Sequence, residues 1–599
     1  MAFNDILISK IDGGLFTRTI PEKIPVNYSP DLQNIDFESG GSVRNRLGNA
    51  LFGVGVSSLS GVRTLHNFKR QDGIEIPMRS WSTFVEYYNR QTSAWSQLSG
   101  GFTTNLIFGY TDYVDHTYLC NAVDAMFRWN GQYSVVTDIH ASSATVIEVP
   151  SLTNWLSAGE AIIGTMPVYY GSRTSGTLSA MTGISAAIGA SEEIAQAPTS
   201  SRGWGAAVSS TPRGNILITN GDRIFVAGCS AEGTRLYYSG ISAVPISGAT
   251  NFTYSNTHVD NEGGFVTLAD GGAYITALAN RGVGKILGFK KDAIKSFEFK
   301  QIQTNQIDWP TTSDVAQARN CGALASKSAV GVESDVWYVS PGGEVRSVAD
   351  IANQGLSLKD NAMLIAPTMA DLSFVSASGI YHNKKYYLAC KESAAVKNNR
   401  VMVNDLLAND GKGAWSEYVG WNVNDWMDFD GDLYYADSLS HSVYKVGVNY
   451  DDGGYGYESY YKTPLINHDK PHERKRLRYV YLEGYATLGC VLSATCFYDA
   501  LSAGKIEKII YGNEVYVDPT TSITFGDTVF SQGTFGGDPS GSSFVLNKFR
   551  VRLSYNLRNL FNYQLEVKSN IAGQAWRIDQ IASYVEKESE DVFPILNYV

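Results

Sequence analysis

Short runs of alternating apolar and polar residues, separated by turn-forming residues, recur along most of the chain. In the clearest example, residues 216–226, two apolar runs flank Asn220-Gly221-Asp222, and Asn-Gly tolerates the positive φ angles of a tight hairpin. Similar strand–turn–strand units lie at 285–299, 334–348, 379–392 and 427–446. Comparable turns recur roughly every 40–60 residues, which is the period of four-stranded propeller blades, so the pattern predicts a β-propeller of about six to eight blades.

Two local patterns give more specific expectations. Asn130-Gly131 lies between strand-like flanks within residues 126–133 and predicts a further hairpin. Helical spacing of apolar residues is sparse, and residues 313–326 and 358–372 are the best candidates for helices.

Changes in pattern along the chain divide it into four parts. Residues 1–60 contain closely spaced prolines and predict a mostly irregular N-terminal arm, whereas 61–137 and 204–451 carry the propeller pattern. Residues 138–203, rich in Ala, Ser, Thr and Gly, predict a small β domain inserted in the propeller. Residues 452–599 contain longer, strictly alternating strands and predict a C-terminal β-sandwich. The expected fold class is therefore all-β.

The amino-acid composition agrees with an all-β fold, and the net charge reduces the number of function classes to consider. The 599 residues include 58 Gly, 36 Tyr and 25 Phe, which suit short strands and tight turns. The formal net charge of −11 makes the chain a poor candidate for a general DNA-coating protein, which needs a net positive surface. Contact with nucleic acid through a local basic patch stays open. The N-terminal residues lack a basic segment followed by an apolar core, and no apolar run reaches roughly 18 residues. We therefore expect neither a secretory signal nor insertion in a membrane.

Six cysteines are scattered along the chain, and none forms a Cys-x-x-Cys pair. This spacing favours buried free thiols over a disulfide framework or a zinc site, and so predicts folding in a reducing compartment. The six are Cys120, Cys229, Cys321, Cys390, Cys490 and Cys496.

The sequence offers little catalytic chemistry. It contains no His-Glu-x-x-His, Gly-x-Ser-x-Gly or phosphate-loop motif, and the spacing of Gly282-Val283-Gly284-Lys285 favours a turn before a strand. His468 and His472 are the closest pair of histidines, but Pro471 between them disfavours a helical metal site. We expect no enzymatic activity, no cofactor and no metal from these motifs.

Alternating carboxylates in one predicted hairpin leave a choice open. Asp428, Asp430 and Asp432 lie two residues apart, and Asp437 follows. Such spacing can bind calcium, but the order of an EF-hand loop is absent. The alternative is a hairpin whose polar face is solvated.

One basic cluster lies at the entry to the predicted sandwich. It contains Lys470, His472, Arg474, Lys475, Arg476 and Arg478. It could be a solvated edge that discourages strand-to-strand aggregation, or it could contact an acidic neighbouring subunit or DNA.

Residues 24–52 carry a pattern that suggests a family. Its members are Asn34, Phe37, Gly41, Arg44, Arg46 and Gly48. The stretch resembles the start of the nozzle, or tail tubular protein B-like, virion proteins and related tail-hub proteins of tailed bacteriophages. Residues 222–240 and 399–418 are similar to propeller blades of such proteins, although Leu47 stands where the family often has Pro.

The resemblance implies a structural, homo-hexameric ring in the virion tail, made in the host cytoplasm. Such a ring docks on an adaptor ring or portal-proximal tail protein, carries tail fibres or spikes, and lets double-stranded DNA pass during ejection. An acidic lumen would keep the DNA from sticking, with Glu38 and the 428–437 loop as candidate residues. The basic cluster would then face a neighbouring protein, and Arg44 and Arg46 could clamp the propeller or an adjacent subunit through carboxylates.

Two alternative functions remain open at this stage. The first is a receptor-binding tail adhesin, for which a trimeric fibre would normally show elongated repeats. The second is a propeller glycosidase that degrades host polysaccharide through two facing carboxylates. The number of copies in the particle and turnover of a capsular glycan separate these alternatives from the ring.

Overall fold

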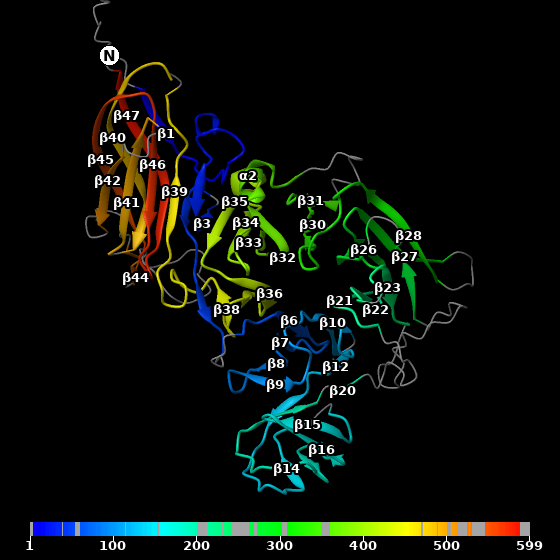
Figure 1. Cartoon of the computed structure of the whole chain (residues 1–599). Coiled ribbons are helices and arrows are strands. Elements are labelled where there is room, and N and C mark those ends of the chain that lie inside the picture. Colours follow the sequence, from blue (N-terminus) through cyan, green and yellow to red (C-terminus); the bar gives the residue numbers. More distant parts are fainter. Residues whose placement is uncertain are drawn as a thin grey trace, which may run out of the picture.

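The computed structural model describes residues 4–587, with gaps. Outside the described residues lie 54–59, 153–154, 201–211, 241–262, 302–307, 349–359, 469–470, 500–504, most of 269–273 and of 512–545, and isolated positions. Strands account for 54% of the chain and helices for 3%, so the fold is all-β, as predicted. Figure 1 shows a propeller between a sandwich at one end and a small domain at the other.

Seven antiparallel sheets of the described residues form the propeller, within the range of six to eight blades that was predicted. Blade 1 contains β6 (Thr64–Lys69), β7 (Glu75–Trp81), β8 (Phe84–Asn89) and β9 (Ala94–Ser99), and blade 2 contains β10 (Gly109–Tyr113), β11 (His116–Cys120), β12 (Phe127–Trp129) and β20 (Thr199–Ser200). Blade 3 contains β21 (Ile216–Asn220), β22 (Arg223–Ala227), β23 (Arg235–Tyr238) and β24 (Gly264–Thr267). Blade 4 contains β25 (Ala277–Asn280), β26 (Lys285–Phe289), β27 (Ala293–Gln301) and β28 (Asp308–Gln317).

The last three blades complete the ring. Blade 5 contains β29 (Val330–Val332), β30 (Asp335–Val339) and β31 (Val345–Ser347). Blade 6 contains β32 (Leu372–His382), β33 (Lys385–Glu392), β34 (Arg400–Asp405) and β35 (Ala414–Val419). Blade 7 contains β36 (Val423–Phe429), β37 (Asp432–Asp437), β38 (Val443–Val446) and β5 (Asn49–Leu51). The first strand of each blade contacts the first strand of the next, and β36 contacts β6. The ring is therefore closed.

Turn chemistry explains why the strand–turn–strand units form hairpins. Asp430 and Gly431 link β36 to β37 with φ angles of 55° and 79°, which is the left-handed backbone that a two-residue hairpin turn requires. Asn383 and Lys384 adopt the same conformation between β32 and β33. The hairpins expected at 216–226, 285–299, 334–348, 379–392 and 427–446 are all confirmed.

The C-terminal region forms a sandwich of two antiparallel sheets, as predicted (Figure 1). One sheet has the order β3-β4-β47-β40-β45, with β1 also paired to β47, and the other has the order β2-β39-β46-β41-β42. Their strands are β1 (Asn4–Ile8), β2 (Asp31–Gln33), β3 (Ile35–Phe37), β4 (Val43–Asn45), β39 (Ser459–Lys462), β40 (Lys475–Thr487), β41 (Val491–Tyr498), β42 (Lys505–Tyr511), β45 (Leu546–Leu560), β46 (Tyr563–Ser569) and β47 (Trp576–Lys587). A separate pair joins β43 (Thr524–Phe525) and β44 (Thr528–Val529).

The N-terminal arm differs most from its prediction as a mostly irregular segment. It supplies β1, β3 and β4 to one sheet of the sandwich, β2 to the other, and β5 to the last propeller blade. Four of these strands have only three residues, so the sequence carries little periodic signal for them. Apart from the pairing of β3 with β4, their partner strands lie hundreds of residues away. One continuous apolar core then includes Ile35 from the arm, Leu477 from the sandwich, and Met402 and Trp415 from the propeller.

The inserted domain leaves blade 2 after β12 and returns at β20, with its own apolar core. Its strands are β13 (Tyr133–Val135), β14 (Val146–Glu148), β15 (Gly159–Ile163), β16 (Met166–Tyr170), β17 (Ser172–Arg173), β18 (Thr177–Ser179) and β19 (Glu193–Gln196). The hairpin expected at Asn130-Gly131 is wrong, because β12 and β13 belong to different sheets. Asn130 Nδ2 instead donates to Gln196 Oε1 at 2.8 Å, where the chain passes from the blade into the inserted domain.

Helices among the described residues are short. They are η1 (Pro21–Lys23), η3 (Met363–Ile365), α2 (Ala366–Ala370) and the turn-like α3 (Ala408–Gly411). The candidate helix at 358–372 is confirmed in part by η3 and α2. The candidate at 313–326 is wrong, because its first residues continue β28, which pairs along its length with β27. All six cysteines are buried free thiols, as predicted.

Candidate interfaces and the propeller channel

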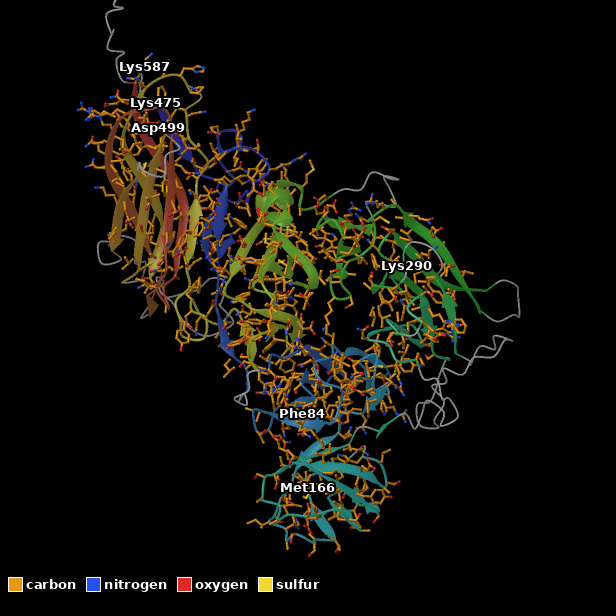
Figure 2. The ribbon with its side chains drawn as sticks, viewed as in Figure 1. Phe84, Met166, Lys290, Lys475, Asp499 and Lys587 are labelled. Atoms are coloured by element: carbon orange, nitrogen blue, oxygen red, sulfur yellow. The ribbon has the colours of Figure 1, made fainter. Side chains whose placement is uncertain are left out.

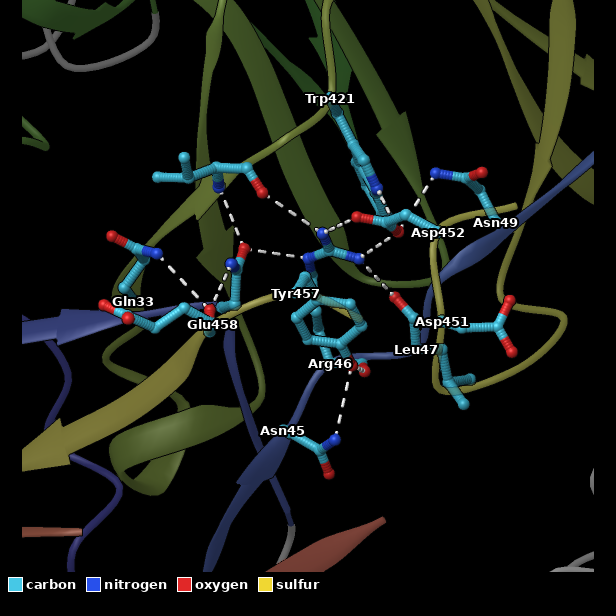
Figure 3. Close-up of polar contacts among 12 residues, drawn as sticks. Gln33, Asn45, Arg46, Leu47, Asn49, Trp421, Asp451, Asp452, Tyr457 and Glu458 are labelled. Carbon is cyan, nitrogen blue, oxygen red and sulfur yellow. Dashed lines mark hydrogen bonds and ion pairs between the residues drawn. The ribbon is translucent and has the colours of Figure 1, made fainter. Parts of the chain in front are cut away.

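Arg46 lies where the arm, the propeller and the sandwich meet (Figure 3). Its side chain is 0% exposed. Its guanidinium donates to both carboxylate oxygens of Asp452, at 2.9 and 2.6 Å, and to Asn34 Oδ1 at 2.9 Å. The backbone oxygens of Leu47 and Val419 accept at 3.0 and 3.2 Å. All five N–H groups of the guanidinium are thus satisfied within the chain.

The surroundings of Arg46 fix this pair in place. The guanidinium lies over the rings of Tyr457 and Trp421, at 4.1 and 4.4 Å from the ring centroids. Asp452 also accepts from Trp421 Nε1 and Asn49 Nδ2, each at 3.0 Å. Burial would lower the pKa of Arg46, but the hydrogen bonds and charge of Asp452 raise it above its ordinary value. Arg46 therefore clamps the propeller within its own chain, one of the two roles considered for it, and presents no surface to an adjacent subunit.

A second buried ion pair lies beside the first. Lys385 Nζ donates to Asp36 Oδ1 at 2.5 Å, and the Tyr418 hydroxyl donates to the same oxygen. Burial would raise the pKa of Asp36, but the charges of Lys385 and Arg44 hold it below its usual value. A cavity of about 210 Å³, lined partly by these four residues, separates the arm from the last two blades.

Arg44 and Glu38 connect the arm to the sandwich. Arg44 Nη1 lies 3.3 Å from Glu38 Oε1, and Arg577 Nη1 on β47 lies 3.0 Å from Glu38 Oε2. The Arg44 side chain is 32% exposed. Glu38, a lumen candidate by sequence, is therefore bound by two arginines of its own chain.

The basic cluster predicted at the sandwich entry does not form one uniform patch. Lys475 is only 4% exposed, and its Nζ donates to the backbone oxygens of Glu473 and Phe561, so its expected role as a surface contact is corrected. Arg478 Nε donates to Glu586 Oε2 at 2.6 Å. Arg474 and His472 are exposed, Arg476 is half-buried, and Lys470 lies outside the described residues.

The structure adds a neighbouring strand that the sequence reasoning missed. On β45, exposed side chains alternate with core residues and present Lys548, Arg550, Arg552 and Arg558. The strand pairs with β40, where Lys548, Arg550 and Arg552 lie opposite Tyr485, Glu483 and Tyr481. Arg558 lies at the end of β45 that pairs with the start of β40, near Arg476 and Arg478. The signal was the alternation Lys-x-Arg-x-Arg at 548–552, which lies some seventy residues after the predicted cluster.

The first strands of the blades surround a cavity of about 420 Å³ along the propeller axis. Asp425 on β36 lies at its wall and accepts from the backbone N–H of Leu65 at 2.8 Å and from Ser378 Oγ at 3.2 Å. Lys327 Nζ also donates to Asp425. Because these partners come from separate blades, the Asp425 carboxylate joins the blades across the channel.

The carboxylates considered for calcium have separate partners. Asp428 pairs with His382 at 3.0 Å and Asp432 with Lys445 at 2.5 Å, while Asp437 accepts from the backbone N–H groups of residues 439 and 440. In the part of the chain that the structure describes, no three His, Cys, Asp or Glu side chains are grouped to hold a metal ion. No helix among the described residues has the length and apolar character needed to cross a membrane.

Comparisons with known proteins add little to this geometry. No protein-family model matches the chain, and no significant match was found among curated protein sequences. An exo-β-1,3-galactanase from Phanerochaete chrysosporium is 9% identical over 88% of this chain and 100% of its own, with a TM-score of 0.20. YCF48 bound to D1 peptide is 8% identical over 69% and 97%, with a TM-score of 0.32. The C-terminal WD40 domain of Sif2 is 10% identical over 74% and 97%, with a TM-score of 0.24.

Proposed function

We propose that this chain is a non-enzymatic structural subunit of a bacteriophage tail, of the nozzle or hub type, which assembles as a homo-hexameric ring around a DNA path. The sequence resemblance at 24–52, 222–240 and 399–418 is the source of this proposal. The observation that supports it best is the junction at Arg46, because a subunit that carries mechanical load needs domains that cannot move apart.

Three features make the propeller and the sandwich one unit. The arm passes through both, with strands in each. The pairs Arg46–Asp452 and Lys385–Asp36 hold the arm against the propeller, and the apolar core continues from one domain into the other. Removing one partner of a buried ion pair costs about 3–5 kcal/mol, so these contacts resist separation.

In this proposal the ring lies in the virion tail, docks on an adaptor ring or portal-proximal protein, and holds fibres or spikes. Double-stranded DNA passes through the ring during ejection and is not retained. Glu38 is already bound by arginines, so the 428–437 hairpin is the remaining candidate for the acidic wall. Asp430, at the tip of that hairpin, is exposed.

Mass determination of the assembled particle tests the proposal. The purified chain is measured by native mass spectrometry and imaged by electron microscopy, alone and with tail proteins co-expressed. Six copies around an open centre support the nozzle. Three copies in a fibre support the adhesin, and a monomer that turns over capsular glycan supports the glycosidase. Either of the last two results would replace the proposal.

A further inference from the structure

The outer face of the six-stranded sandwich sheet concentrates positive charge in an acidic chain. Seven basic side chains lie on the outward positions of β40, β45 and β47, against three acidic ones. The basic residues are Arg476, Arg478, Lys548, Arg550, Arg552, Arg558 and Arg577, and the acidic ones are Glu483, Asp579 and Glu586. We call these residues, with the tyrosines between them, the basic face.

The composition of the basic face fits a protein partner better than DNA. Tyr479, Tyr481 and Tyr485 of β40 and Tyr584 of β47 lie on the same side as the arginines, and Arg552 lies over the ring of Tyr479 at 4.8 Å. Arginine and tyrosine are the residues enriched in protein interfaces and their hot spots. Acidic residues among the arginines would repel a DNA backbone.

Part of the basic charge is not neutralised within the chain. Glu483 pairs with Lys548 at 2.8 Å, Glu586 with Arg478 at 2.6 Å, and Asp579 with Arg577 at 2.8 Å. Among the described residues, Arg552 and Arg558 form no ion pair, and both are exposed. These two arginines are therefore the positions at which a carboxylate of an acidic partner would form the most favourable new ion pairs.

The chain carries a complementary surface on its inserted domain. Residues 133–196 contain five acidic residues, one arginine and no lysine, a net charge of −4. Asp138 and Glu160 are exposed. Large apolar side chains are also exposed there, including Ile139 at 79% and Tyr169 at 49%, and Tyr169 pairs across the strands with Glu160. A surface with acidic and apolar side chains together matches the arginines and tyrosines of the basic face.

We propose that the basic face of one copy binds the acidic inserted domain of the next copy. The two surfaces lie at opposite ends of the molecule, with the propeller between them, so they meet only between copies (Figures 1 and 2). Contacts between two different surfaces of identical chains are head-to-tail, and they close into a ring when the rotation permits. The inference rests on the proposed function and assigns the contact that builds its ring.

Charge reversal and its rescue test this contact in the full-length chain. One variant carries Arg552→Glu with Arg558→Glu, and another carries Asp138→Lys with Glu160→Lys. Each should weaken self-association at least about tenfold, because like charges would then face each other across the contact. The combined variant should recover most of the association, since opposite charges face each other again. Sedimentation over a concentration series, at low and high salt, measures these changes.

The controls separate this inference from the function on which it rests. Arg281→Glu with Lys291→Glu makes the same charge change on exposed propeller positions and should leave association unchanged. Thermal unfolding of every variant checks that it folds. If rings form from the wild-type chain and persist in both reversal variants, the inference is wrong but the proposed function stands. If the wild-type chain stays monomeric alone and with its co-expressed tail proteins, both are wrong.

A DNA-binding measurement addresses the other possible occupant. A labelled double-stranded DNA should bind the wild-type chain and the Arg552→Glu, Arg558→Glu variant equally weakly. Loss of strong DNA binding in that variant, with association unchanged, would show that the basic face binds phosphates and would overturn the inference.

Discussion

Arg46 in the arm junction and Arg552 on the basic face show how differently one residue type can be used in this chain. Arg46 is completely buried, donates five hydrogen bonds and lies between aromatic rings. Arg552 is exposed, and the contact that defines its position is the ring of Tyr479. The first arginine holds domains together, whereas the second leaves its hydrogen-bonding capacity to solvent or a partner.

The difference comes from the acceptors that the fold brings to each side chain. Asp452 reaches Arg46 only because the arm crosses between the propeller and the sandwich, whereas Asn34 reaches it from within the arm. On β45 the neighbouring strand offers one carboxylate, Glu483, which already pairs with Lys548 and lies 3.8 Å from Arg550. The positive charge of an arginine in the sequence therefore does not reveal whether it holds domains together or stays exposed. The acceptors that the fold places around its guanidinium do.

Arg46→Ala is expected to have the largest effect. It leaves the carboxylate of Asp452, which is 17% exposed, without its cation, and should destabilise the junction by about 3 kcal/mol. Hydrogen exchange of residues 34–52, followed by mass spectrometry, measures the loss as faster exchange in the arm. Arg552→Ala is the matched control and should change stability by less than about 0.5 kcal/mol. Equal effects of the two substitutions would contradict the distinction drawn above.

Gly48→Ala tests the same junction through the backbone. A Cβ at this position would lie 1.8 Å from the backbone oxygen of Asp451, next to the carboxylate that binds Arg46. Forcing atoms into a packed site costs about 1–3 kcal/mol, and chemical denaturation should show a loss of that size. Gly331→Ala, where a Cβ meets open space, is the control and should be close to neutral. A neutral Gly48→Ala would show that the two segments can separate at little cost.

The sequence predicted the parts of this structure that depend on local signals. Blade hairpins follow from turn residues such as Asp430-Gly431, and the sandwich follows from long alternating strands. The arm strands could not be predicted, because four of the five have only three residues and so no detectable period, and most of them pair with strands far away in the sequence. The burial of Arg46 and Lys475 was missed for the same reason, since their acceptors come together only in the fold.

Acid should weaken the junction through Asp36. Its pKa is lowered in the folded chain, so its contribution is present above the ordinary carboxyl pKa of about 4 and is lost as the pH falls through the folded value. The free energy of unfolding that Asp36 contributes falls by at most about 1.4 kcal/mol for each pH unit. Thermal unfolding at pH values below about 5 measures the slope, which Asp36→Asn should reduce. Asp430→Asn, at an exposed turn, should leave the slope unchanged, and an unchanged slope in Asp36→Asn would assign the acid sensitivity elsewhere.

The response to salt should show the smallest difference between the two regions. Lys548 and Glu483 are 50% and 17% exposed, and a pair of this kind contributes about 0.2–1 kcal/mol at low salt. A double-mutant cycle with Lys548→Met and Glu483→Gln should therefore give a small coupling that falls further in about 1 M salt, where the screening length is near 3 Å. The same cycle at Arg46 and Asp452 should give a much larger coupling that salt scarcely changes, because the Arg46 guanidinium is 0% exposed and solvent ions do not reach it. A salt-sensitive coupling at Arg46 would mean that the junction opens to solvent, and the propeller and sandwich would then move independently.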